Sequence, residues 1–309
     1  MKNVSIFTEF VLLGLSGDPQ IQALLFMLFL GIYLLTLMGN LVMILLIRVD
    51  SHLHTPMYFF LGHLSFLDLS FSSVTVPKML QNFLSRKKSI SVWGCITQSF
   101  FFTLSGGTEA CLLSAMAYDR YAAICHPLVY NVVMSRSLCT VIVSIAWVVG
   151  FLVSLINSLF IQNLHFCGSN IISHFSCELP PLFPLSCTDP TANVILLAVS
   201  CACMGLLTLP LILFSYSRII SAILRIRSSE GQGKAFSTCS SHLTIVLLFY
   251  GTTFFRYLIP PSGSILEQVV SIQYSVITSL LNPLIYSLKN QEVQAALQRM
   301  IRQHKCPSG

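Results

Sequence analysis

The stretch IQALLFMLFLGIYLLTLMGNLVMILLI, which is Ile21–Ile47, decides the fold because it contains no Asp, Glu, Lys or Arg. About 20 apolar residues in an α-helix are enough to cross the hydrocarbon core of a bilayer. The whole chain of 309 residues has the same character, with 54% hydrophobic residues, 9% charged residues and a mean hydropathy of +0.78. Soluble domains carry roughly 25% charged residues. The composition therefore excludes a soluble globule, a disordered chain and a collagen-like rod, and it predicts a protein of the lipid bilayer.

Apolar segments recur along the chain and predict an all-α fold, a seven-transmembrane helix bundle built as one domain over residues 1–309. Acidic residues in the apolar cores of these segments are limited to Asp68 and Glu109. The expected transmembrane helices cover residues 21–47, 57–80, 92–125, 137–161, 190–225, 235–259 and 268–288.

The two ends of the chain differ from these segments. Residues 290–302 are expected to form a short amphipathic helix on the membrane surface. Its apolar face would carry Val293, Ala296, Leu297, Met300 and Ile301. No signal peptide is expected, because the first twenty residues contain Glu9 and Asp18 and no apolar run.

The basic residues predict the orientation in the cell membrane. Seven crossings place the two termini on opposite sides. With the N-terminus outside, eleven of the 17 Lys and Arg residues lie on the cytoplasmic side and six lie outside, which is the usual bias. Arg86–Lys88 in the first outer loop opposes this orientation, whereas the glycosylation acceptor sequence at Asn3 supports it. We expect an extracellular N-terminus with glycosylation at Asn3.

Cysteine positions predict disulfides at the outer end. The chain has 11 Cys, and in this orientation four of them lie outside: Cys95, Cys167, Cys177 and Cys187. Four cysteines allow three pairings. We expect one bridge from Cys95 to the long second outer loop, residues 162–189, and one bridge within that loop. His174 and Glu178 in the loop are weak evidence for a metal site.

Asp68 and Glu109 are expected to meet inside the membrane. Each lies eleven residues from the inner end of its segment, which corresponds to a depth of about 16 Å. Asn40 and Asn282 lie within one or two helical turns of this layer. Two carboxylates at one depth in a low dielectric cannot both stay charged without a partner. Either a cation such as sodium lies between them, or one carboxylate holds a proton.

A second set of polar residues lies near the inner end and has the composition of a two-state switch. The adjacent Asp119 and Arg120, followed by Tyr121, offer an ion pair that helix movement could break. Pro283 removes a backbone hydrogen bond, and we expect Asn282 to satisfy the freed carbonyl groups. Further candidates at this depth are Tyr216, His242 and Tyr286.

The outer half of the bundle is expected to hold a ligand. Gly106 and Gly107 lie about 20 Å above Arg120 and would open space between helices. Plain helix packing is the alternative interpretation, because small residues also let helices approach closely. The candidate ligand-binding residues are Phe102, Thr103, Gly106, Gly107, Cys111, Ser200, Met204, Tyr250, Thr253, Phe254, Tyr257, Ile272 and Ser275.

These residues also limit the chemistry of the ligand. They include no acid or base, and we expect the neighbouring Arg256 to point toward the lipid headgroups. An ammonium ligand would require a buried carboxylate, and a retinal Schiff base would require a Lys within the seventh segment, where Lys289 comes too late. The pattern therefore disfavours amine receptors and opsins, and it favours a small, neutral, mostly apolar ligand of modest affinity.

Asp68, Asp119–Tyr121 and Asn282–Tyr286 within seven spans resemble the rhodopsin-like G-protein-coupled receptors. Within that class the chain resembles the odorant receptors, over about residues 3–300. The stretches that carry this resemblance are LHTPMYFFL (Leu53–Leu61), MAYDRYAAIC (Met116–Cys125), KAFSTCSSHL (Lys234–Leu243) and PLIYSLKN (Pro283–Asn290). Ala123 and Lys289 depart from the usual Val and Arg. The pattern is similar to the tetrapod class for airborne odorants rather than the fish-like class.

The resemblance implies the disulfides Cys95–Cys177 and Cys167–Cys187, and a sodium site at Asp68 and Glu109. It also implies that Arg120, Tyr216, His242 and Tyr286 take part in activation. The expected partners are a small volatile odorant, a stimulatory G protein that raises cyclic AMP, and membrane lipid, with no further cofactor.

Other functions find less support in the sequence. A transporter or channel would show inverted repeats, broken helices or a charged pathway, and the two halves of the chain show no similarity. An intramembrane enzyme would need a nucleophile, a base and an orienting group at one depth. The excess of basic residues lies at the ends of apolar segments, so nucleic-acid binding is not expected.

Overall fold

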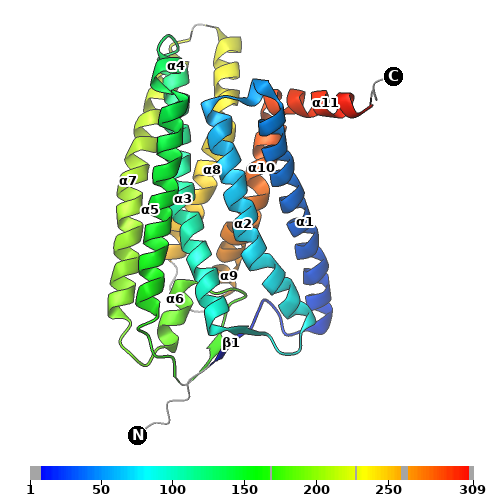
Figure 1. Cartoon of the computed structure of the whole chain (residues 1–309), viewed down its shortest axis with the longest axis vertical. Coiled ribbons are helices and arrows are strands. Elements are labelled where there is room, and N and C mark those ends of the chain that lie inside the picture. Colours follow the sequence, from blue (N-terminus) through cyan, green and yellow to red (C-terminus); the bar gives the residue numbers. More distant parts are fainter. Residues whose placement is uncertain (1–7, 168, 227, 259–263, 306–309) are drawn as a thin grey trace.

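The computed structural model describes residues 8–167, 169–226, 228–258 and 264–305, and it is a bundle of seven long helical rods (Figure 1). The first six rods are α1 (Pro19–Val49), α2 (Pro56–Leu84), α3 (Val92–Cys125), α5 (Arg136–Ile161), α7 (Thr191–Leu224) and α8 (Ser229–Leu258). The seventh rod consists of α9 (Ile265–Ile272), the π-helix η3 (Gln273–Ile277) and α10 (Thr278–Lys289). The predicted all-α bundle of seven helices is therefore confirmed.

Shorter elements occupy both ends of the bundle (Figure 1). One end carries three strands, β1 (Glu9–Leu12), β2 (Ser89–Ser91) and β3 (Ile171–Ile172), and the helices α6 (Leu179–Leu182) and η2 (Phe183–Leu185). The opposite end carries η1 (Ser51–Leu53), α4 (Tyr130–Val133) and α11 (Gln291–Lys305). We call the first the disulfide end, since the cysteines of both disulfides lie there, and the second the Arg120 end.

Six of the seven rods are long and apolar enough to span a membrane by length and composition. The remaining rod, α8, is 30 residues long but begins with the polar sequence SEGQGKAFSTCSSH, which lowers its mean hydropathy. Its apolar residues follow from Leu243 onward. The helix therefore begins six residues before the expected start at residue 235, because these polar turns continue it beyond the apolar segment.

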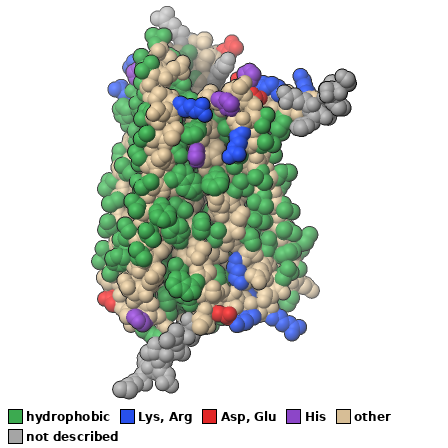
Figure 2. Space-filling model, in the orientation of Figure 1, with side chains coloured by type: hydrophobic (Ala, Val, Ile, Leu, Met, Phe, Trp, Pro, Cys, Tyr) green, Lys and Arg blue, Asp and Glu red, His purple; other side chains and the backbone are tan. Residues whose placement is uncertain are grey.

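The helices differ in how much of their surface is buried inside the bundle, with α3 at its centre and α7 at its periphery. The most apolar window of α3 is 61% buried in the bundle, whereas that of α7 is only 11% buried. Large apolar side chains such as Leu24, Leu206 and Leu247 are 65–76% exposed. Figure 2 shows hydrophobic side chains over the middle of the bundle and charged side chains near its two ends. A surface of this kind matches the hydrocarbon core of a bilayer.

Helix starts follow from local capping. The Asp18 carboxylate accepts from the backbone N–H groups of Gln20 and Ile21 at the start of α1, and Pro19 occupies the first turn. Ser91 and Ser135 cap α3 and α5 in the same way. Pro77 lies inside α2, and that helix continues to Leu84.

The sheet at the disulfide end was not expected from the sequence. Its strand order is β2-β1-β3, with Phe10 antiparallel to Ile90 and Leu12 parallel to Ile172. Phe10 and Leu12 are almost fully buried, which gives β1 the alternating burial of a strand with one face in a core. A four-residue strand is too short to stand out among long apolar helices, so composition did not reveal it.

The predicted amphipathic helix is α11, and polar contacts attach it to the bundle. Val293 and Ala296 are buried, while Ile301 is 45% exposed. Arg299 Nε donates to Asp50 Oδ2 at 2.8 Å in the loop after α1. This hydrogen bond from Arg299 lowers the pKa of Asp50 to about 2 and keeps its carboxylate ionised.

Replacing Arg299 by Gln is expected to loosen α11, because Asp50 loses its charged partner and its pKa returns toward the ordinary value. The native pKa of Asp50 is depressed, so the contribution of the pair is complete above about pH 4 and is lost as the pH falls toward about 2. Amide hydrogen exchange in α11 at neutral pH should become faster by up to about fivefold, the scale of a half-exposed ion pair.

Arg302→Gln, which changes an exposed side chain on the same helix, serves as the control and should leave this exchange unchanged. Equal exchange rates in both variants would contradict a role for the Asp50–Arg299 pair.

Candidate functional site

A buried polar node lies midway along the bundle, where α2, α3 and α10 meet. Asn282 Nδ2 donates to Asp68 Oδ2 at 2.9 Å and lies 3.5 Å from Glu109 Oε1. All three side chains are at most 3% exposed. The two carboxylates lie together, as counting residues from the helix ends predicts, and one amide group bridges them.

Pro283 leaves one helical carbonyl group without its usual hydrogen bond. The residue that donates to this carbonyl group is not the one expected from the sequence. Pro283 has no N–H for the carbonyl of Ser279 four residues earlier. Asn40 on α1 donates to that carbonyl oxygen at 3.0 Å. At Gly39 a Cβ would lie 3.2 Å from Pro283 Cγ, so the glycine allows the close approach that brings Asn40 into reach. The expectation for Asn282 was wrong because its amide group is engaged by the carboxylates.

At the Arg120 end, an ion pair and a tyrosine fix the position of Asp119. Arg120 Nη2 lies 2.8 Å from Asp119 Oδ2, and Tyr130 of α4 donates to Asp119 Oδ1 at 2.7 Å. Asp119 is fully buried. Burial and the neighbouring Asp119 carboxylate raise the pKa of Tyr130, so it stays a hydrogen-bond donor. Tyr121 contacts His126 through its hydroxyl group at 3.0 Å.

A chain of hydrogen bonds joins α7, α8 and α3 beside this ion pair. His242 Nε2 lies 3.1 Å from the Leu113 carbonyl oxygen, which can only accept. His242 Nδ1 therefore accepts from Tyr216 Oη, 2.6 Å away. Tyr286 of α10 is fully buried, and its hydroxyl group has no hydrogen-bond partner in the described residues. The two tyrosines and the histidine thus lie where a change in helix position would exchange partners.

Aromatic rings fill the interior in the half toward the disulfide end. The ring of Phe102 on α3 lies 5.0 Å from that of Tyr274 on η3. A Cβ at Gly106 would lie 2.9 Å from Tyr274 Oη, so this glycine makes room for the tyrosine. Phe249 of α8 contacts the same ring at 6.1 Å. Tyr274 is therefore a central residue of this region, although the sequence analysis did not select it.

Gly107 lies in a helix contact rather than beside open space. A Cβ at Gly107 would lie 3.3 Å from the backbone of Gly150 on α5 and 4.0 Å from Met204 Cε on α7. A Cβ at Gly150 would in turn lie 2.2 Å from Thr108 Oγ1. Gly107 and Gly150 thus allow α3 and α5 to cross closely, which corrects the expectation that Gly107 opens a cavity.

The other candidate pocket residues are placed as follows. Tyr250 donates to Thr208 Oγ1 at 2.7 Å, which joins α8 to α7. Ser200 accepts from Asn157 Nδ2 on α5 at 3.2 Å. Hydroxyl groups that donate to carbonyl groups of their own helices belong to Thr103, Thr253 and Ser275. Side chains that are partly buried against the apolar cores belong to Cys111, Met204 and Ile272.

One candidate ligand-binding residue does not line the interior of the bundle. Phe254 is 63% exposed and faces the outer surface of the bundle, because the inward face of α8 at this level carries Tyr250 and Thr253. The side chain of Tyr257 lies outside the described residues, as does Asn3.

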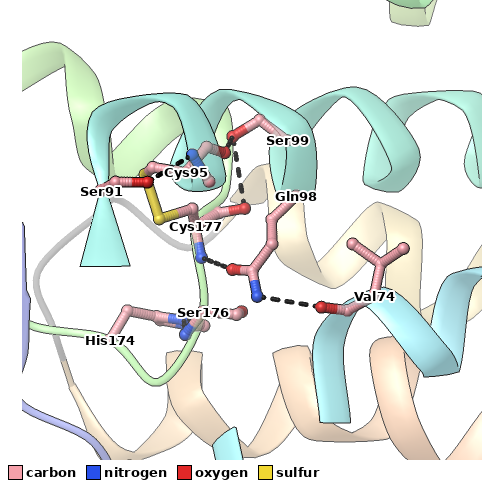
Figure 3. The surroundings of a disulfide bond; sticks show 9 residues. Val74, Ser91, Cys95, Gln98, Ser99, His174, Ser176 and Cys177 are labelled. Atoms are coloured by element: carbon pink, nitrogen blue, oxygen red, sulfur yellow. Dashed lines mark hydrogen bonds between the residues drawn. A yellow bond between two sulfur atoms is a disulfide. The ribbon is translucent and has the colours of Figure 1, made fainter. Parts of the chain in front are cut away.

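Two disulfides and a glutamine build a cap over this region, and Figure 3 shows the Cys95–Cys177 bond beside Gln98. The bonds Cys95–Cys177 and Cys167–Cys187 are both present, as the resemblance implied. Gln98 on α3 accepts from the Cys177 N–H at 3.1 Å and donates to the Val74 carbonyl group of α2 at 3.2 Å. The loop after Cys177 is therefore fixed between α2 and α3.

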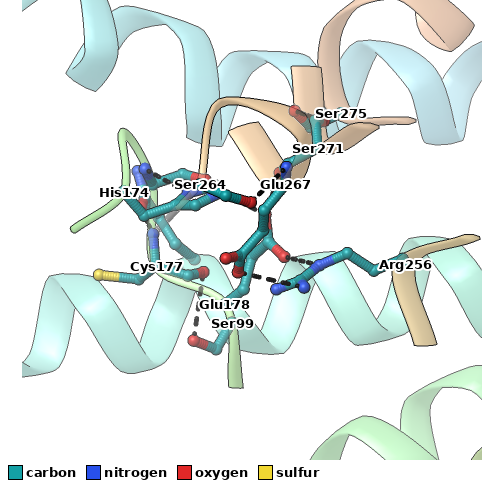
Figure 4. Close-up of polar contacts among 11 residues, drawn as sticks. Ser99, His174, Cys177, Glu178, Arg256, Ser264, Glu267, Ser271 and Ser275 are labelled. Atoms are coloured by element: carbon teal, nitrogen blue, oxygen red, sulfur yellow. Dashed lines mark hydrogen bonds and ion pairs between the residues drawn. The ribbon is translucent and has the colours of Figure 1, made fainter. Parts of the chain in front are cut away.

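A buried ionic cluster lies beneath the cap (Figure 4). Arg256 Nε is 3.1 Å from Glu178 Oε2, and Arg256 Nη1 is 3.2 Å from Glu267 Oε1. Ser271 also donates to Glu178, and His174 Nε2 lies 3.7 Å from the same carboxylate. Both glutamates are 1% exposed.

Arg256 points inward rather than toward the headgroups, and this corrects the expectation from the sequence. Glu178 comes from the second outer loop, and Glu267 lies on α9. Because neither glutamate belongs to the same helix as Arg256, the local sequence pattern did not predict these ion pairs. Glu178 is bound by Arg256 and Ser271, which leaves little support for a metal site with His174. No group of three or more His, Cys, Asp or Glu residues suited to a metal occurs in the part of the chain that the structure describes.

The model of the olfactory receptor family matches residues 29–304. The chain belongs to the olfactory receptor family. Olfactory receptor 8S1 from Homo sapiens is 58% identical over 292 residues, which cover 94% of this chain and 81% of that relative. Olfactory receptor 5G9 from Mus musculus is 49% identical over 98% of both chains. Olfactory receptor 5A1 from Homo sapiens is 50% identical over 98% of this chain and 97% of its own length.

Membership of this family agrees with the geometry described above. An olfactory receptor is a multi-pass membrane protein that detects odorants and acts through G proteins, and it is not an enzyme. The predicted family and fold class are thereby confirmed. The structure adds the contacts of Tyr274 and Tyr130, which the sequence did not single out, and the bond from Asn40 to the Ser279 carbonyl group.

The Gly107–Gly150 contact predicts the effect of Gly107→Leu in this olfactory receptor. The larger side chain should push α3 away from α5 and destabilise the fold by about 1–3 kcal/mol, the usual cost of overpacking. Surface expression and thermal denaturation of the purified receptor measure this loss.

Gly31→Leu is the control, because no atom lies within 4 Å of a Cβ at Gly31. Normal surface expression of Gly107→Leu with a lost odorant response would instead restore the interpretation of Gly107 as a cavity residue.

The ionic cluster predicts a second stability effect. Arg256→Met leaves two buried glutamates without their cation and should cost about 3–5 kcal/mol in unfolding free energy. The triple variant Glu178→Gln, Arg256→Met, Glu267→Gln removes the charges together and should recover most of the loss. Thermal denaturation distinguishes the two, and a single variant as stable as the parent would argue against the cluster.

Proposed function

We propose that this odorant receptor binds a small, neutral, mostly apolar volatile between α3, α7, α8 and η3, with its N-terminus outside the cell. The bound odorant shifts α8, and a stimulatory G protein docks at the Arg120 end and raises cyclic AMP. The observation that carries this proposal is the position of α8, since it contributes side chains to both the aromatic interior and the hydrogen-bond chain at the Arg120 end.

The chemistry of the interior supports a neutral ligand. The rings of Phe102, Phe249 and Tyr274 provide apolar and polarisable surface. Tyr250 and Thr208 provide hydroxyl groups. The nearest described cation, Arg256, is already paired with two carboxylates. An odorant is therefore held by shape and by one or two hydrogen bonds, and its few atoms limit the affinity to about the micromolar range.

The contacts of α8 suggest how binding reaches the other end. Tyr250 and His242 lie eight residues apart on this helix, which is about two turns, so they lie close to the same face. A displacement of Tyr250 away from Thr208 rotates or tilts α8 and strains the bond between Tyr216 and His242. Tyr286 has a hydroxyl group without a described partner and can accept a new one.

Arg120 is the residue that the displaced α8 exposes. It lies on α3 beside the His242 contact and is held by the adjacent Asp119. An outward movement of α8 opens the Arg120 end, where Arg120 would leave Asp119 and contact the G protein. This sequence of events assigns the cytoplasmic side to the Arg120 end, in agreement with the distribution of basic residues.

Sodium binding at the polar node is a further part of the proposal. Asp68 and Glu109 supply two carboxylates in a site with one bridging amide group. The side-chain oxygen Oδ1 of Asn282 has no hydrogen-bond partner among the described residues. Oxygen donors of this kind suit a hard cation. A sodium ion would offset one of the two carboxylate charges in the resting receptor, and a shared proton is the alternative.

Arg120→Ala tests the signalling proposal. At matched surface level, the cyclic AMP response to an activating odorant should fall at least tenfold, because the G protein loses its contact. An N-terminal epitope tag read on intact cells reports the surface level and the orientation together. Lys87→Ala, at the exposed disulfide end, is the control. An undiminished response in Arg120→Ala would refute the mechanism.

Asp68→Asn and Glu109→Gln test the sodium proposal. Sodium at tenfold its dissociation constant should stabilise the parent receptor by about 1.4 kcal/mol relative to the same concentration of choline, and either substitution should remove this difference. Glu230→Gln, at the exposed start of α8, should retain it. A parent receptor that responds to pH but equally to both cations would indicate a shared proton.

A further inference from the structure

A groove of about 890 Å³ lies on the surface of the bundle between α1, α2 and α5, close to the Arg120 end. It is lined by the end of α1, the start of α2 and the start of α5, and none of the residues named for the odorant or the G protein belongs to it. Figure 2 views this side of the bundle and shows Lys, Arg and His side chains above a hydrophobic surface. The groove is therefore polar at one end and apolar along its length.

The polar end of the groove is positively charged. Arg48 from α1 and Arg136 from α5 line it, and both are exposed. Neither arginine forms an ion pair with any of the residues that the structure describes. The described residues that line the groove include no Asp or Glu, and the nearby Asp50 is already paired with Arg299. The two arginines thus lack an anionic partner in the part of the chain that the structure describes.

Helix dipoles add to this positive charge. The helices α2 and α5 both begin at the groove, at Pro56 and Arg136, and a helix N-terminus attracts anions. Thr55 precedes α2 without a side-chain hydrogen bond that caps the helix. His54 also lines this end, and its ring N–H can donate a hydrogen bond to an anion. All these groups favour a phosphate at the mouth of the groove.

The remaining wall is suited to a hydrocarbon chain. Phe66 and Trp147 face each other across α2 and α5 with ring centroids 6.0 Å apart. Gly62, one turn before Phe66 on α2, adds no side chain, so the groove stays open there. His63 lies seven residues after Pro56, which places it about 10 Å along α2, on the way from the cationic end to Phe66. The order of phosphate-binding, polar and apolar surfaces follows the order of parts in a phospholipid.

We propose that this groove binds an anionic glycerophospholipid, with its phosphate at Arg48 and Arg136 and an acyl chain along Phe66 and Trp147. A sterol has only a hydroxyl group and would leave both arginines without a counter-charge. The proposal rests on the membrane location of the receptor. The proposed orientation enters only in the choice of leaflet, since anionic lipids are concentrated on the cytoplasmic side.

Native mass spectrometry of the purified receptor tests the proposal without odorant or G protein. Phosphatidylserine should bind at least tenfold more tightly than phosphatidylcholine. The variant Arg48→Gln, Arg136→Gln should lose at least tenfold in affinity for phosphatidylserine, while Arg218→Gln, Arg302→Gln, which removes two arginines at the same end but outside the groove, should change it less than twofold. Equal losses in both double variants, or equal binding of the two lipids, would overturn the proposal.

A second variant separates the groove from general surface charge. Gly62→Leu keeps every charge, and a Cβ at this position meets only the side chain of Ile47, at 3.7 Å from Cδ1 and 3.9 Å from Cγ2, so the fold should tolerate it. Its side chain fills the groove and should reduce phosphatidylserine binding at least fivefold with unchanged thermal stability. Undiminished binding would overturn the proposal.

Two competing compounds test whether the groove binds a phospholipid, a free phosphate ester or a sterol. Glycerol 3-phosphate without acyl chains should fail to displace the lipid, and cholesterol should not displace it either. Displacement by cholesterol with no effect of the arginine substitutions would assign the groove to a sterol and overturn the proposal. A failed lipid experiment together with a normal loss of cyclic AMP in Arg120→Ala would leave the proposed function intact.

Discussion

A polar group inside a membrane has no water to bind, and this constraint explains the arrangement of the bundle interior. Asn282 bridges the two buried carboxylates, Asn40 reaches across from α1 to a carbonyl group freed by proline, and His242 joins two helices through both ring nitrogens. Each contact joins different helices, so the groups that need a partner also hold the bundle together. A change in helix position must exchange these partners, and this limits the bundle to a few discrete arrangements.

The two ends of the bundle are held together by different kinds of contact. At the disulfide end, two covalent bonds, a short sheet and a buried ionic cluster connect the loops to the helices. At the Arg120 end, the connections are noncovalent, such as the Tyr130–Asp119 hydrogen bond and the Asp50–Arg299 ion pair. Noncovalent contacts exchange more readily than disulfides do. Movement is therefore expected at the Arg120 end, with the disulfide end as the more rigid part of the bundle.

Much of this fold was accessible from the sequence, because membrane spans and depth follow from simple counting. The seven spans, the shared layer of Asp68 and Glu109, and the similar depth of Tyr216 and His242 needed only helix rise and apolar runs. Counting residues along a helix did not predict a residue's role where that role depends on a contact from another helix or loop. Gly106 and Gly107 are adjacent, yet one accommodates Tyr274 and the other contacts Gly150. The π-helix η3 adds a residue to one turn, so the face that carries Tyr274 could not be read from a regular period. Arg256 meets carboxylates from a loop and another helix, which no local pattern contains.

The strand β1 sets an order for the assembly of the chain. It leaves the ribosome before any of the helices, but its two neighbours, β2 and β3, are made about 80 and 160 residues later. The central strand can pair with β2 once residue 91 has been made, but its other edge stays unpaired until residue 172 has been synthesised and has reached the same side of the membrane. The segment made first is thus among the last to find its place, and a bulky fusion attached just before Thr8 would compete with that late docking step.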